Sequence, residues 1–194
     1  MGPSRNMLIC LTITHSFFLI FSSTNAQKPQ PETTSIPYKT VNSFCLHKRL
    51  NVNRAFCLRV LKSPASANAK PNDFIPLLQV AINSTSSFIC KTLTLLQNLY
   101  DDEKTTAMLI PAVNECLSAY EEIAGYITYV ISDASQESAI AGLDGEVIKD
   151  YIGRCIKALA KTKEPEIADR NKEARNYAKL LIDIADNLRT RKPK

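Results

Sequence analysis

AMLIPAVNECLSAYEEIAGYITYV, residues 107–130, is the stretch that decides the fold. Its apolar residues recur at steps of four and three, which places them in one continuous stripe along a helix. The residues between them, including Asn114, Glu121 and Glu122, suit a surface in contact with water. One helix cannot bury so long a stripe, so this segment predicts packing against other helices. The stripe consists of Leu109, Val113, Cys116, Tyr120, Ile123, Ile127 and Val130.

Three other segments have the same helical periodicity. The segment at 137–160 is expected to start irregularly, because its glycines weaken a helix. Four amphipathic helices with short connections predict an all-α protein whose residues 72–190 form an antiparallel four-helix bundle. The expected start signals are Asn72 or Asp73 as a cap, Pro111 as a kink or a true beginning, and Pro165 as a first helical residue.

The first 26 residues have the layout of a secretory signal peptide. A single basic residue, Arg5, precedes an apolar run over 7–21, and small or polar residues end the segment at Ala26. The alternative is an uncleaved membrane anchor, although about 15 residues is short for a membrane span. We therefore expect a secreted protein with no membrane contact after signal removal. Residues 27–40, rich in proline and threonine, predict a flexible lead-in.

Cysteine usage points to an oxidising compartment. The chain has six cysteines, and removal of the signal takes away Cys10. The five cysteines that remain can form two disulfides and leave one free thiol in fifteen ways. A zinc site is the alternative, but there is no close Cys-x-x-Cys pair. Cys45 and Cys57 are near enough in sequence to clip a helical hairpin over 41–62, whereas Cys90 beside an apolar stripe suits a buried thiol.

Composition and motifs argue against catalysis. The formal charge is +5 and no nucleic-acid-binding motif accompanies it, so no nucleic-acid partner is expected. The sequence lacks a glycine-rich phosphate loop and a nucleophile motif, and its paired carboxylates fall at helix ends or on polar faces. We expect no enzyme activity, no metal and no cofactor. Asn83 begins an N-glycosylation sequon on the polar side of a helix.

Two motifs and a cysteine spacing carry a family resemblance. Residues 51–57 (NVNRAFC) close the short hairpin, residues 112–120 (AVNECLSAY) contain Cys116, and Cys155 follows 39 residues later. From about Val41 to Leu188 the chain resembles the plant invertase and pectin methylesterase inhibitor family. The resemblance implies disulfides Cys45–Cys57 and Cys116–Cys155, with Cys90 as a free thiol.

The resemblance also implies a function, which is to block the active-site cleft of a plant carbohydrate enzyme in the cell wall or, alternatively, the vacuole. The target is either invertase or pectin methylesterase, bound by a monomer in a 1:1 complex. Invertase inhibitors of the family carry Pro-Lys-Phe between the second and third bundle helices, where this chain has Ser138, Ala139 and Ile140. Esterase inhibitors commonly have threonine before the fourth cysteine, where this chain has Arg154.

The chain thus departs from both target patterns. We favour pectin methylesterase. Without Pro-Lys-Phe the chain lacks the whole motif that enters the active site of invertase, whereas it departs from the esterase-inhibitor pattern by one substitution, which is more easily tolerated. The expected contacts with the target are Ser138, Ala139, Ile140 and Arg154. A solvated arginine beside a carboxylate is the alternative for Arg154. Two other functions stay open: a helical carrier of an apolar ligand, and a non-inhibitory interaction protein of the same family.

Overall fold

The computed structural model describes residues 38–47, 50–71, 73–133, 145–162 and 164–189. All regular structure within these ranges is helical. The long helices are α4 (Ile75–Asp101), α5 (Ile110–Asp133), α7 (Gly145–Ala158) and α8 (Pro165–Arg189). Two short helices, α2 (Lys39–Cys45) and α3 (Arg54–Leu61), precede them, and 3-10 turns η1 (Pro64–Ser66) and η2 (Leu159–Lys161) follow α3 and α7. No helix in the described ranges combines the length and apolar character that a membrane crossing requires.

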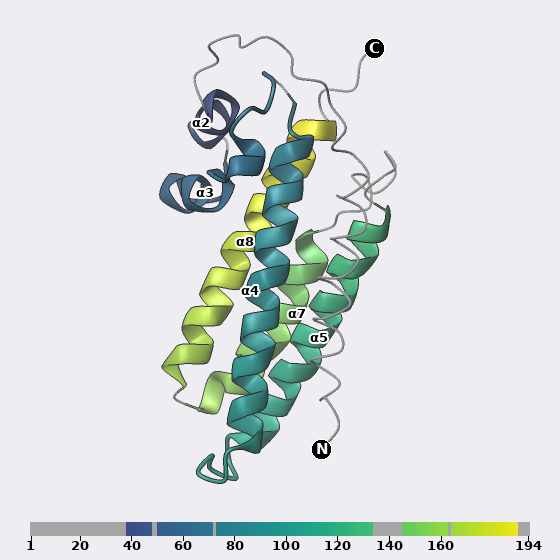
Figure 1. Cartoon of the computed structure of the whole chain (residues 1–194). Coiled ribbons are helices and arrows are strands. Elements are labelled where there is room, and N and C mark those ends of the chain that lie inside the picture. The colour runs from purple at the N-terminus through teal and green to yellow at the C-terminus, as the bar shows by residue number, and fades with distance from the viewer. Residues whose placement is uncertain (1–37, 48–49, 72, 134–144, 163, 190–194) are drawn as a thin grey trace.

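The four long helices form the predicted bundle. Helix α4 packs against α5 and α8, and α7 packs against the same two helices, so the four close into a ring. Figure 1 shows them side by side, with the α4–α5 loop and the α7–α8 turn at one end and the α2–α3 pair near the other. The expectation of an all-α four-helix bundle is confirmed.

The stripe of α5 lies in the core, as its periodicity predicts. Helix α5 begins at Ile110, three residues after the expected start. Pro111 is therefore in the first turn, where its missing N–H removes no helical hydrogen bond, and it marks the beginning of the helix. The side chain of Val130 lies outside the described part of the chain. The other six members of the stripe are buried: Leu109, Val113, Cys116, Tyr120, Ile123 and Ile127.

The other helix starts agree in part with the expected signals. The Asp73 carboxylate accepts a hydrogen bond from the Ile75 amide at 3.2 Å, although the residue at the cap position itself is Phe74. Asn72 lies outside the described residues. Helix α8 begins at Pro165 as predicted. Helix α7 is described from Gly145, and the first residues of the segment expected to start irregularly, 137–144, lie outside the described residues.

The N-terminal helical hairpin, α2 and α3, is fixed to the bundle by aromatic contacts and one buried carboxylate. α2 begins at Lys39, so it includes two residues of the expected lead-in. Phe56 meets Tyr177 of α8 edge to face, with ring centroids 5.0 Å apart. Asp183 of α8 accepts hydrogen bonds from the Asn51 amide at 2.9 Å and its side-chain nitrogen at 2.7 Å. Burial raises the pKa of the Asp183 carboxyl, against the opposing effect of these hydrogen bonds.

Two disulfides join the cysteines that the family resemblance pairs. Cys45–Cys57 links α2 to α3, and Cys116–Cys155 links α5 to α7. The free thiol expected at Cys90 is contradicted, because the structure records Cys90 as disulfide-bonded. No cysteine in the described ranges is a free thiol.

Candidate functional site

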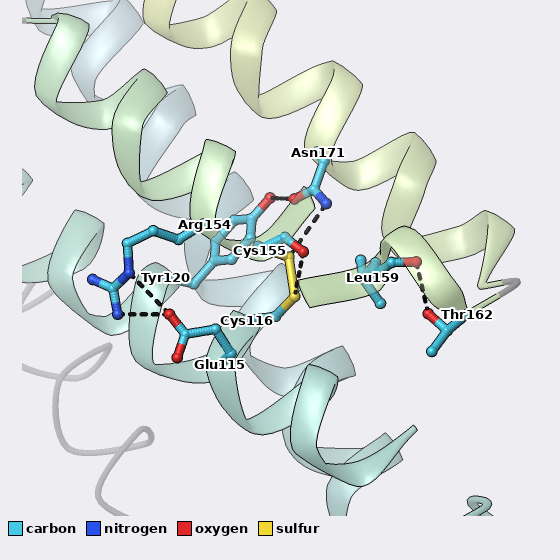
Figure 2. Close-up of a disulfide and its surroundings, with 8 residues drawn as sticks. All are labelled: Glu115, Cys116, Tyr120, Arg154, Cys155, Leu159, Thr162 and Asn171. Carbon is cyan, nitrogen blue, oxygen red and sulfur yellow. Dashed lines mark hydrogen bonds and ion pairs between the residues drawn. A yellow bond between two sulfur atoms is a disulfide. The ribbon is translucent and has the colours of Figure 1, made fainter. Parts of the chain in front are cut away.

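Arg154 on α7 is the centre of a charged cluster on the face that α5 and α7 share. Its Nε donates a hydrogen bond to Glu115 at 2.9 Å, and a terminal nitrogen donates to Glu122 at 2.7 Å. Both carboxylates belong to α5, two helical turns apart, so one guanidinium ties the polar face of α5 to α7. Figure 2 shows the side chain reaching away from the disulfide toward Glu115.

Electrostatics in this cluster favour the charged forms of both partners. The hydrogen bond from Arg154 lowers the pKa of the Glu122 carboxyl. The carboxylates in turn raise the pKa of the Arg154 guanidinium. Tyr151 lies one turn before Arg154, with its ring 5.7 Å from the guanidinium carbon, and its hydrogen bond to Glu122 raises the pKa of the phenol. Arg154 and Glu122 are thus both charged at neutral pH.

The cluster remains accessible to a partner despite its internal pairing. The side chains of Arg154, Glu115 and Glu122 are 38%, 43% and 42% exposed. Exposed ion pairs of this kind contribute little to stability. The structure therefore matches the alternative for Arg154, an arginine beside carboxylates, and at the same time leaves its guanidinium reachable from solvent.

On the inner side of α7, a buried polar contact supports the core disulfide. The Tyr120 hydroxyl donates to Asn171 Oδ1 at 3.0 Å, and Asn171 Nδ2 donates to the sulfur of Cys155 at 3.3 Å. Burial raises the pKa of Tyr120, so its hydroxyl keeps its proton and can donate. Figure 2 shows Asn171 entering from α8 toward the disulfide. Neighbouring residues of α7 thus face in different directions: Arg154 outward to a charged surface, and Cys155 inward to the core.

Sequence reasoning missed Asn171, although a signal was present. The apolar stripe of α8 passes from Ile167 to Ala174 in one step of seven, and position 171 is the residue that completes the pattern of four and three. Asn171 is 1% exposed, so it occupies the core position that this gap indicates. A polar residue in such a gap points to a hydrogen-bonded partner in the core.

The remaining predicted site residues are placed as follows. Ser138, Ala139 and Ile140 lie outside the described residues, so their contact with a target stays a prediction. Asn83 is exposed in the middle of α4, but Thr85 of the same sequon is buried and donates its hydroxyl to the Ala81 carbonyl at 2.7 Å. Glycosylation at Asn83 stays a prediction, and it would have to precede the folding of α4.

No metal-binding chemistry gathers in the described part of the chain. Groups of three or more histidine, cysteine, aspartate or glutamate side chains that could hold a metal ion are absent from those residues. The carboxylates of the α5–α7 face are instead engaged by Arg154. What this arrangement offers chemically is recognition: fixed charges, a half-exposed guanidinium and an adjacent phenol.

Comparison with known proteins supports the fold. No family model matches this chain. A search of curated proteins found no match. Among solved structures, the fold is similar to the crystal structure of a mutant form of a pectin methylesterase inhibitor from Arabidopsis, with a TM-score of 0.58 and 20% sequence identity. The similarity covers 69% of this chain and 88% of that chain. At this identity the likeness shows a shared fold.

Proposed function

We propose that the protein is a secreted inhibitor of a plant cell-wall carbohydrate enzyme, with pectin methylesterase as the target in preference to invertase. The observation that carries the proposal is the bundle itself, whose fold matches most of a pectin methylesterase inhibitor. The two disulfides add support, because such bonds persist in oxidising compartments such as the cell exterior. The inhibitor acts as a monomer that covers the active-site cleft in a 1:1 complex.

The surface that makes this contact is the α5–α7 face, centred on Arg154. Arginine and tyrosine are enriched among residues that dominate protein–protein binding energy, and Tyr151 lies beside the guanidinium. Because Glu115 and Glu122 already fix the side chain, binding orders few additional bonds and so loses little conformational entropy. Ser138, Ala139 and Ile140 remain part of the proposed contact.

The experiment is a direct inhibition assay with one matched control. Purified protein is titrated into pectin methylesterase and into invertase, and Arg154→Gln is compared with Arg175→Gln. Both variants remove one arginine charge, but Arg175 is on α8, away from the α5–α7 face. We expect Arg154→Gln to raise the inhibition constant for the esterase by about tenfold, a loss typical of one hot-spot contact. The Arg175 variant should inhibit like the parent.

Two outcomes contradict the proposal. Equal inhibition by both variants would show that Arg154 is not part of the contact. The proposed inhibition would then stand, but its assignment to the surface around Arg154 would fail. A parent protein that inhibits neither enzyme would instead favour a non-inhibitory interaction protein with the same fold. Circular dichroism of each variant shows whether any loss of inhibition arises from loss of helix.

A further inference from the structure

A pocket lies between α7 and α8 on a different side of α7 from the charged cluster. Its volume is about 650 Å³, within the range of small-molecule sites, which is roughly 300–1,000 Å³. Leu159 of η2 and Pro165 and Ala168 of α8 line it, together with Ile156 of α7. Figure 2 shows Leu159 and Thr162 in the turn that follows α7, where this pocket is formed. Its walls are mostly apolar.

Two cations lie in the lining of this pocket. Lys172 and Arg175 are three residues apart on α8, so they share one face of the helix, and both are exposed. Neither forms an ion pair with another described residue. This differs from Arg154, which two carboxylates neutralise. The pocket thus joins apolar walls to uncompensated positive charge.

The one carboxylate in the lining belongs to the other end of the pocket. Glu164 precedes α8, and at 1.5 Å of rise per residue it is separated from Lys172 by about 12 Å along the helix axis. An anion beside Lys172 and Arg175 therefore experiences little repulsion from Glu164. Pro165 and Ala168 offer apolar contact between these ends, and Pro165 lies about 10 Å from Lys172 along the helix axis.

We propose that the α7–α8 pocket binds a small amphipathic anion, in which a carboxylate pairs with Lys172 and Arg175 and an apolar body of about 10 Å lies along Ala168, Pro165 and Leu159. The site uses different helices and residues from the proposed inhibitory contact, so it stands or fails independently of enzyme inhibition. Hydrophobic burial provides the affinity and the two cations select the sign of the charge.

The test uses decanoate as the probe, and calorimetry measures its binding to the whole protein in its secreted form. Decyltrimethylammonium, which has the same chain with a positive head group, is the ligand control. Decanoate is expected to bind with a dissociation constant below about 1 mM and at least about tenfold more tightly than the cation. Binding should weaken as salt is added, because the cations that select the anion are exposed.

Two variants of the α7–α8 pocket are each compared with a matched control. Lys172→Glu/Arg175→Glu should lose about tenfold in affinity for decanoate, whereas Lys62→Glu/Lys91→Glu, which reverses two exposed charges elsewhere, should not. Ala168→Trp fills the pocket from an exposed position in the first turn of α8 and should abolish binding. Ala55→Trp, an exposed alanine in the first turn of α3, should leave binding unchanged.

A measurement on the parent protein keeps the test independent of variant folding. Decanoate should shift the methyl NMR signals of Ile156 and Leu159 and leave those of Ile89 in the α4 core unchanged. The proposal is overturned if decanoate does not bind, if the two head groups bind equally, or if Ala168→Trp binds like the parent. Binding of an acidic peptide without binding of decanoate would also overturn it, in favour of a protein partner.

Discussion

The N-terminal hairpin and the four-helix bundle each contain one disulfide between described residues, but the two regions depend on that bond differently. Cys116–Cys155 lies in a core that the bundle helices already form, with both cysteines fully buried. Cys45–Cys57 joins helices of only seven and eight residues. Helices this short are not stable alone. The same kind of bond therefore reinforces an extensive core in the bundle, whereas in the hairpin it holds together two short helices that contribute only the edge of that core.

Removing the bundle disulfide should cause the largest loss of stability. Cys116→Ala/Cys155→Ala opens a loop with a sequence separation of 39. Chain entropy predicts a loss of about 4 kcal/mol in the free energy of unfolding. Chemical denaturation measures it. Because the core helices remain packed, the transition should stay cooperative, and a loss under about 1 kcal/mol would show that the bridge adds nothing to the bundle.

Removing the hairpin disulfide should have a smaller and more local effect. Cys45→Ala/Cys57→Ala opens a loop with a separation of 12, for which the same argument gives about 3 kcal/mol. Amide hydrogen exchange should increase in α2 and α3 while the centre of α5 keeps its protection. Equal loss of protection in both regions would show instead that the hairpin and the bundle unfold as one unit.

The third prediction concerns the carboxylate that attaches the hairpin to α8. Asp183→Asn leaves one oxygen to accept from Asn51 and Val52 and turns a nitrogen toward these donors. Buried donors without an acceptor cost about 1–3 kcal/mol. Denaturation of the variant, with hydrogen exchange in the hairpin, measures this loss. A variant as stable as the parent would show that the hairpin is attached by its aromatic contacts alone.

The pH dependence of Asp183 follows from the direction of its pKa shift. Burial raises the pKa of this carboxyl in the folded protein, so the folded state binds the proton more tightly than the unfolded chain. Its contribution to stability is fully present below the ordinary pKa and is lost as pH rises through the raised one. The stability difference between parent and Asp183→Asn should therefore widen as pH falls into that window. A narrowing difference would contradict a raised pKa.

Sequence alone could predict the bundle because the stripes of its helices repeat over many turns. Leu109 to Ile127 mark a buried face whatever the details of the partner helices. The attachment of the hairpin was not predictable in the same way. Asp183 and Asn51 are 132 residues apart, and neither interrupts a periodic pattern that would reveal it. Polar contacts between distant segments leave no local signal.

The candidate site was predictable only in part, for similar reasons. The position of Arg154 before an inward cysteine correctly places it at a surface. Its pairing with Glu115 and Glu122 depends on how α5 and α7 pack, which spacing alone does not give. The state of Cys90 was missed because cysteine spacing alone does not show which thiols meet in the folded protein.

The smallest expected effect on stability is that of Arg154. Its ion pairs are more than a third exposed on both sides, and such pairs add little to folding. Arg154→Gln should melt within about 2 °C of the parent. A calorimetric scan checks this. A much larger shift in melting temperature would show that the charged cluster stabilises the bundle, which would argue against its role as a contact surface.

The measurement that tests the central claim most directly is the titration of the purified protein into pectin methylesterase, with invertase in parallel. The account predicts saturable inhibition of the esterase at a 1:1 ratio and little or no inhibition of invertase. It also predicts that inhibition weakens when Arg154 is replaced and persists when Arg175 is replaced. Full activity of both enzymes at saturating protein would contradict it.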